Sequence, residues 1–77
     1  MEWTDADRDV MTEIIVLLDT DTDVVTPDRV ASRVDQSEEE VWASMRSFRE
    51  AGLVTCADTD GLLVTDVSDE GAALVRP

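Results

Sequence analysis

The sequence predicts a small α+β domain in which helices come first and a β-hairpin follows. Apolar residues recur with helical spacing up to Gly52, and after it the pattern changes to the alternation typical of strands. Asp60-Gly61, a dipeptide typical of hairpin turns, separates "LVTCA" from "LLVTDV". A chain of 77 residues is the size of one domain, so residues 1–77 are expected to fold as a single unit.

The first helix is predicted from about Asp5 to Leu18. Thr4 can cap its start, and Asp7 stands three residues later in the capping-box position. The apolar residues form a stripe wide enough to be covered on more than one side: Val10, Met11, Ile14, Leu17 and Leu18, with Ile15 and Val16 beside them.

Two further helices joined by a tight turn are predicted over about residues 27–51, after a very short strand at Val24 and Val25. Thr26 followed by Pro27 marks the first of these helices, because proline suits the first helical position. Ser37 can cap the next one, and Gly52 can end it in the left-handed conformation. Three residues of this helix have core spacing: Val41, Met45 and Phe48.

The end of the chain predicts a β-hairpin over about residues 53–67 and a last short helix. Ser68 can cap that helix, and three apolar residues can pack it against the domain: Ala72, Leu74 and Val75. The expected order is therefore helix, short strand, helix, helix, strand, turn, strand, helix.

Acidic residues dominate the composition: 19 Asp and Glu stand against 6 basic residues, all Arg, for a net charge of −13. Hydrophobic residues make up 43% and follow regular patterns, which argues against disorder. In molar salt the Debye length is about 3 Å, so surface carboxylates scarcely repel one another and keep the protein hydrated. We favour a halophilic origin, since the acids are spread along the chain. The alternative is a dedicated acidic interaction module, such as a DNA mimic.

Residues that carry chemistry are scarce. The chain has no His and no glycine-rich phosphate loop, and the single Cys56 has no evident activating partner, so we expect neither an enzyme nor a cofactor. "DTDTD" (residues 19–23) begins like a calcium loop. However, Val24 and Val30 stand where that loop needs Gly and Glu, and no metal site is expected.

Membrane insertion is not expected either. No apolar run approaches the roughly 18 residues of a membrane span, and "MEWTDADRD" lacks the basic start of a signal peptide. The expected location is the cytoplasm.

Three segments within about residues 26–75 carry a resemblance to a known family. "TPDRVASRVDQSEEEV" is similar to the second helix, tight turn and third helix of a helix-turn-helix. "MRSFREAGLV" looks like a recognition helix that leads into a wing, and "LLVTDVSDEGAAL" like the wing's return strand with the helix after it. Together they resemble the winged helix-turn-helix family, in particular MarR-type and related archaeal transcription regulators.

The resemblance implies a helix-turn-helix at about 27–51, a wing at about 53–67, and a regulator whose third helix docks in the major groove of double-stranded DNA. With about 100° per residue, four residues face away from the core: Glu39, Ala43, Arg46 and Glu50. Two pairs flank this stripe: Trp42 with Arg49, and Glu40 with Ser47.

The residue types suggest roles for these positions. Arg can bond guanine, Glu can accept from cytosine N4, and Ala can lie against a thymine methyl group. The expected base readers are Glu39, Glu40, Trp42, Ala43 and Arg46. The expected phosphate contacts are Arg33, Ser47 and Arg49.

A second function stays open at this point. The start of the third helix (residues 38–40) and the wing tip with Asp58 and Asp60 are acidic and would repel phosphates. The glutamates also stabilise a helix N-terminus whatever the function. Trp3 and Trp42 could instead form a partner surface. A halophilic DNA-binding regulator, acting as a homodimer because one short helix gives little specificity, is favoured; a winged-helix protein–protein adaptor without DNA binding is the alternative.

Overall fold

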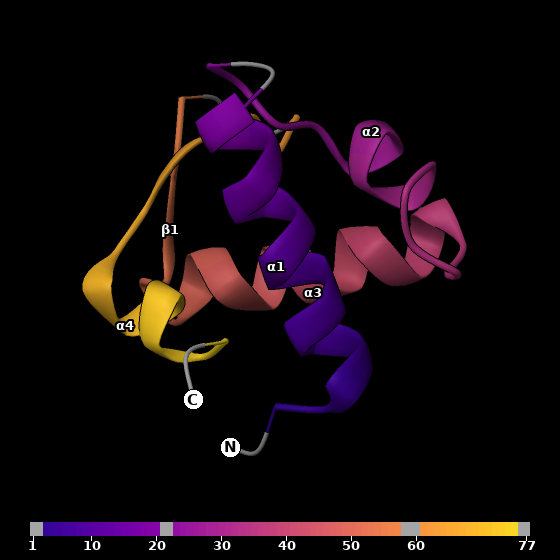
Figure 1. Cartoon of the computed structure of the whole chain (residues 1–77), viewed down its shortest axis with the longest axis horizontal. Coiled ribbons are helices and arrows are strands. Elements are labelled where there is room, and N and C mark those ends of the chain that lie inside the picture. The colour runs from indigo at the N-terminus through magenta and orange to yellow at the C-terminus, as the bar shows by residue number, and fades with distance from the viewer. Residues whose placement is uncertain (1–2, 21–22, 58–60, 76–77) are drawn as a thin grey trace.

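Most helix boundaries follow from local capping. The computed structural model describes residues 3–20, 23–57 and 61–75 (Figure 1), so Asp21 and the hairpin-tip residues Asp58 and Asp60 lie outside the described residues. This part of the chain forms an α+β fold of four helices and one two-stranded hairpin. In order, the elements are α1 (Asp5–Thr20), α2 (Pro27–Ala31), α3 (Glu38–Glu50), β1 (Val54–Cys56), β2 (Val64–Val67) and α4 (Asp69–Ala73).

α1 begins with the expected capping box. The Thr4 amide donates to Asp7 Oδ2 at 3.0 Å, and the Asp7 amide donates to Thr4 Oγ1 at 3.1 Å. The helix ends at Thr20, two residues beyond the expected Leu18. The Thr20 hydroxyl donates to the Val16 carbonyl at 2.6 Å, a back-bond to the preceding turn that is compatible with helical backbone at this position.

α3 begins with a second capping box and ends as its sequence predicts. Ser37 Oγ accepts from the Glu40 amide at 3.2 Å, while Glu40 Oε1 accepts from the Ser37 amide at 3.2 Å. At the other end Gly52 has φ 76°. The amides of Gly52 and Leu53 then bond the carbonyls of Arg49 at 3.1 Å and Phe48 at 2.8 Å. This pair of bonds is a Schellman motif, which turns the chain into β1.

α2 starts as expected, with Thr26 at the N-cap position, but it ends at Ala31. Residues 32–37 therefore connect it to α3 in place of the expected tight turn. Thr26 precedes Pro27, yet its side chain makes no capping bond to the helix amides. A hydrogen bond with the Thr26 side chain instead lowers the pKa of Asp28 below its ordinary value. The start of the helix is therefore fixed by the backbone angle of Pro27 rather than by a hydrogen bond from the helix amides to the Thr26 side chain.

The hairpin is shorter than expected. β1 and β2 pair antiparallel, with Val54 opposite Val67 and Thr55 opposite Asp66, and a bulge follows Thr55. Leu62 was expected inside the second strand, but its φ of 49° lies in the left-handed region, so β2 begins after it. The expected strand at Val24 and Val25 is reduced to a single bridge between Val25 and Val64.

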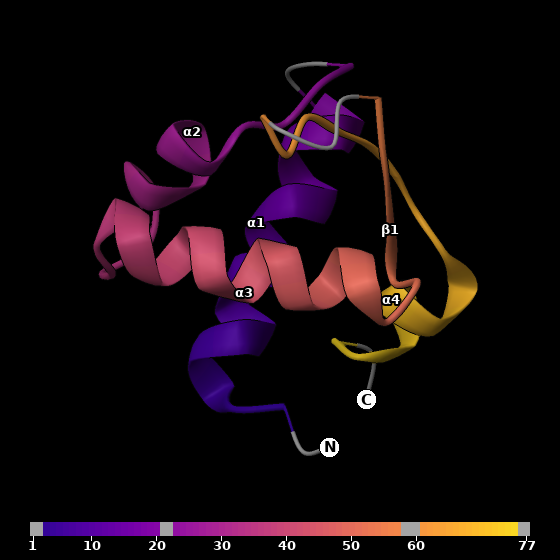
Figure 2. The same cartoon turned by 180° about the vertical axis from the view of Figure 1, so that it is seen from behind.

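One hydrophobic core joins all these elements except α4, which packs at its edge. Figures 1 and 2 show α1 crossing one side of α3, with α2 and the hairpin at opposite ends of α3. The core residues are Val10, Met11, Ile14, Leu17, Val25, Val30, Val41, Met45, Phe48, Leu53, Val54, Leu62 and Val64. Val10, Met11, Ile14 and Leu17 of the expected α1 stripe are buried, and Ile15 and Leu18 are half-buried. Val16 is exposed, so the buried stripe is narrower than expected. No helix in the described part of the chain is long and apolar enough to cross a membrane.

Candidate nucleic-acid interface

Four residues form an exposed row along α3, which we call the outward stripe: Glu39, Ala43, Arg46 and Glu50. The opposite face of the helix is buried, through Val41, Ser44, Met45 and Phe48. α1 covers that buried face, so the stripe lies on the far side of the molecule from α1 (Figures 1 and 2). The helical spacing predicted this orientation of all four residues.

Arg46 is the one cation of the outward stripe. It is exposed and takes part in none of the ion pairs of the described residues, including the one with Glu50 that their spacing would permit. Ala43 lies one turn before it and adds only a methyl group to the surface. The arginine donors are therefore available to a ligand, and a ligand can approach the helix closely at Ala43.

Glu40, an expected base reader, is held at the start of α3. Its Oε1 accepts from the Ser37 amide at 3.2 Å and from the Ser37 hydroxyl at 3.1 Å. Glu39 is exposed and belongs to the stripe. The two neighbouring glutamates thus differ in availability, because only Glu40 stands at the N3 position of the capping box.

The residues expected to flank the stripe are partly withdrawn from solvent. Trp42, Ser47 and Arg49 are half-buried, and Trp42 packs against the hydrophobic core. Arg49 lies close enough to Cys56 to act on its charge, although burial dominates and raises the pKa of that thiol. These side chains can offer only part of their surface to a ligand.

Arg33, an expected phosphate contact, is turned toward α1. Its Nε lies 2.7 Å from Oε2 of Glu13, in an ion pair between the turn that follows α2 and the middle of α1. Because α1 is on the opposite side of α3 from the outward stripe, this guanidinium does not extend the surface of the stripe. A phosphate would have to compete with Glu13 for it.

Trp3, considered above as a partner surface, packs within the chain. It is half-buried, and its ring centroid lies 5.2 Å from that of Phe48 with the planes tilted by 53°. This geometry is a favourable aromatic contact. Most of the ring therefore serves to cover the core at the start of α1.

One polar contact of α3 was missed by the sequence reasoning. Ser44 is 8% exposed, and its hydroxyl donates to Asp7 Oδ1 at 2.7 Å. The bond ties the start of α1 to the middle of α3. A signal was present: Ser44 stands on the core-facing side of the helix, between Val41 and Phe48, where a polar side chain needs a partner.

Comparison of the chain with protein-family models, curated proteins and solved structures gave no match. Residues 3–20, 23–57 and 61–75 also contain no group of three or more His, Cys, Asp or Glu side chains arranged to hold a metal ion. The arrangement of the side chains themselves is therefore the basis for a functional proposal.

Proposed function

We propose that the protein is a DNA-binding transcriptional regulator of the winged helix-turn-helix type, with α3 as its reading helix. The order of elements supports this, since α2, a connection of six residues (32–37) and α3 lead through Gly52 into a hairpin that would serve as the wing. The observation that carries the proposal is the outward stripe. It combines an uncommitted arginine, a small residue and an accepting carboxylate on the exposed side of one helix.

The dimensions of α3 suit this role. Its 13 residues make a rod about 20 Å long, and the major groove of about 12 Å width admits one helix. Arg46 would donate to O6 and N7 of a guanine, Ala43 would lie against a thymine methyl group, and Glu39 would accept from cytosine N4. A homodimer would place two such helices about 34 Å apart on successive turns of DNA.

The net charge of −13 restricts the conditions for binding rather than excluding it. Affinity from phosphate contacts falls with a slope of about −0.9 per contact, so six contacts lose roughly eight decades between 0.1 M and 3 M salt. A basic patch therefore contributes little in molar salt, and recognition there must rely on base hydrogen bonds and shape. A halophilic cell is the setting in which an acidic surface and DNA reading are compatible.

The alternative, a winged-helix adaptor that binds protein through Trp3 or Trp42 in place of DNA, has less support. Both rings are half-buried and pack against the core. An interface centred on either would have only part of an aromatic surface to use.

The decisive experiment compares wild type with Arg46→Ala in molar KCl against fragments of the source genome, including the promoter of the protein's own gene. We expect the wild type to retain specific fragments and Arg46→Ala to bind them about tenfold to a hundredfold less tightly, because a bidentate guanine contact contributes about 1–3 kcal/mol. Arg8→Ala is the matched control. This exposed arginine lies on α1 beside Asp5 and should leave binding unchanged. If the wild type retains no specific fragment at any salt at which it stays folded, the proposal is wrong.

A further inference from the structure

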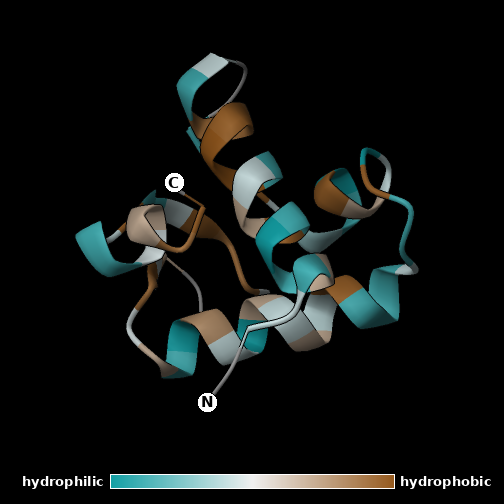
Figure 3. Cartoon of the chain, turned by 60° about the horizontal axis from the view of Figure 1, so that its bottom comes forward, coloured by the Kyte–Doolittle hydropathy of each residue, from teal (hydrophilic) through white to brown (hydrophobic). Residues whose placement is uncertain are grey.

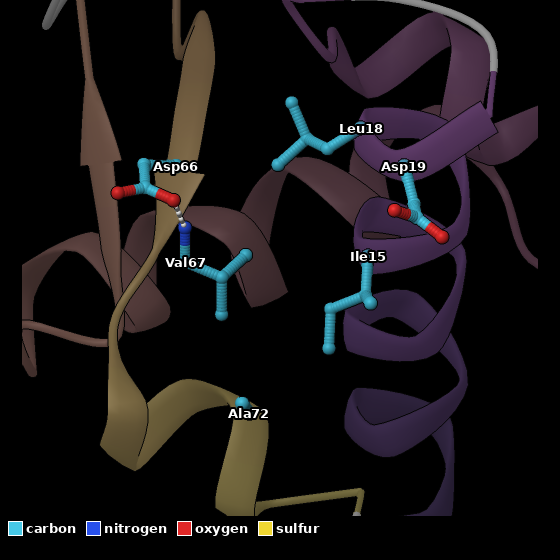
Figure 4. A pocket seen from close by; sticks show the side chains of 6 residues that line it. All are labelled: Ile15, Leu18, Asp19, Asp66, Val67 and Ala72. Atoms are coloured by element: carbon cyan, nitrogen blue, oxygen red, sulfur yellow. Dashed lines mark hydrogen bonds between the residues drawn. The ribbon is translucent and has the colours of Figure 1, made fainter.

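A shallow hollow lies between α1, β2 and α4, which we call the α1–β2–α4 groove. It encloses about 270 Å³ and is lined by Ile15, Leu18, Asp19, Asp66, Val67 and Ala72 (Figure 4). Ile15 and Leu18 project from α1 toward Val67 on the other wall. Figure 3 shows the same apolar character in the second half of α1, in contrast to the hydrophilic ends of α3.

The floor of the groove is apolar and incompletely covered. Ile15, Leu18, Val67 and Ala72 are all half-buried, and the first three pack against the core. The volume is below the roughly 300–1,000 Å³ of typical small-molecule sites. It suits one or two apolar side chains presented by another polypeptide better than an enclosed ligand.

The rim of the groove is acidic. Asp19 and Asp66 are exposed, and neither forms an ion pair within the part of the chain that the structure describes. Asp19 also stands in the last turn of α1, which contains no basic residue. The negative end of the helix dipole adds to its charge there, so a cation at this position would be attracted by both.

A second copy of the chain fits this rim poorly. In a two-fold dimer the same patch would face itself, which brings acidic rims together between two subunits that each carry −13. A segment with apolar residues and Arg or Lys beside them matches both the floor and the rim.

We propose that the α1–β2–α4 groove docks an amphipathic basic segment of a partner protein. Apolar side chains of the segment fill the hollow between Leu18 and Val67, and its Arg or Lys residues meet Asp19 and Asp66. The outward stripe lies on the side of α3 that faces away from α1, so docking in the groove is independent of what α3 binds. The partner adds to the proposed reading helix rather than replacing it.

The test uses two synthetic peptides and the isotope-labelled protein, at the lowest KCl concentration at which the protein stays folded, because molar salt would screen the ion pairs. One peptide is an amphipathic helix with Leu on one face and Arg at its borders, and the other carries Glu in place of each Arg. We expect the Arg peptide to shift the amide signals of Ile15, Leu18, Val67 and Ala72 while the signals of the outward stripe stay in place. The Glu peptide should bind at least about tenfold less tightly, because its charges face the acidic rim.

Paired variants then test the rim. The double variant Asp19→Asn/Asp66→Asn should weaken the Arg peptide by about tenfold, since two exposed ion pairs are lost. Asp9→Asn/Glu38→Gln removes the same charge at exposed sites outside both the groove and the outward stripe, and it should change affinity less than about twofold. Equal losses in the two double variants, equal binding of both peptides, signals that shift on α3 instead, or no binding would each overturn the proposal. A homodimer detected by ultracentrifugation would also overturn it, if the amide signals of the groove residues shift as the dimer forms. The DNA experiment with Arg46→Ala can fail or succeed without altering any of these readouts.

Discussion

The outward stripe of α3 and the α1–β2–α4 groove both contain two acidic residues, but they differ in exposure and polarity. The stripe is exposed, belongs to one helix and places Arg46 between the carboxylates of Glu39 and Glu50. The groove is half-buried and apolar, needs three elements, and keeps its carboxylates at the rim. The contrast shows that the position of an acidic residue matters more than its number. In the proposed functions, a carboxylate beside Arg46 would share in reading a polar ligand, whereas a carboxylate beside Leu18 and Val67 would favour a basic one.

The groove includes a residue of α4, whereas the outward stripe does not. A substitution that displaces α4 should therefore change the groove and leave the stripe intact, and Gly71→Ala is the substitution with the largest expected effect. A Cβ at position 71 would clash with the Leu53 carbonyl oxygen and would lie 2.8 Å from Cγ1 of Val67. That carbonyl is fixed, because it accepts from the Ser68 amide at 2.9 Å and from the Ser68 hydroxyl at 3.1 Å. We expect a loss of about 3 kcal/mol in the free energy of unfolding, measured by urea denaturation in molar KCl.

Gly52→Ala is the matched glycine control. A Cβ there meets nothing within 4 Å, and only the φ of 76° opposes it, so the loss should be about 1 kcal/mol. Amide spectra of Gly71→Ala should change around Val67 and Ala72 but not at Ala43 and Arg46. Wild-type stability in Gly71→Ala, or equal spectral change on both surfaces, would show that α4 does not shape the groove in this way.

Ser44→Ala tests the connection between the two surfaces. The hydrogen bond from Ser44 to Asp7 joins α3, which carries the outward stripe, to α1, which forms one side of the groove. Losing a hydrogen bond to a carboxylate at 2.7 Å should cost about 1.5 kcal/mol of unfolding free energy. Ser47→Ala, half-buried on the same helix, should cost less than about 0.5 kcal/mol. A double-mutant cycle with Asp7→Ala measures the pair directly, and a coupling near zero would contradict the assigned bond.

The smallest effect concerns charge, where the two surfaces should behave alike. Screening of a net charge of −13 should raise the melting temperature by about 5 °C or more between 0.1 M and 3 M KCl, equivalent to about 1 kcal/mol. Glu39→Gln/Glu50→Gln on the stripe and Asp19→Asn/Asp66→Asn at the groove should flatten this dependence equally, since the repulsion is spread over the molecule. A melting temperature indifferent to KCl would refute the halophilic interpretation.

Much of the candidate DNA interface could be predicted from sequence because it lies on one helix. Once Ser37 and Gly52 fix the ends of α3, the period of the helix determines that Glu39, Ala43, Arg46 and Glu50 share a face. The roles of Arg33 and Glu40 could not be settled in this way. Arg33 forms an ion pair with Glu13, and Glu40 accepts a hydrogen bond from the Ser37 amide in the capping box. Each of these contacts would compete with a contact to DNA.

The sequence by itself determined the order of the elements, where each helix begins and where α3 ends. Capping boxes, Pro27 and Gly52 act through hydrogen bonds and backbone angles within a few residues, so a local pattern is enough to specify them. Only the tertiary structure decided which distant groups meet: Ser44 with Asp7, Trp3 with Phe48, and Leu18 across from Val67. Those contacts depend on how α1 crosses α3 and on how closely Gly71 lets α4 approach Leu53 and Val67. No local period encodes that packing, because it results from filling one shared core.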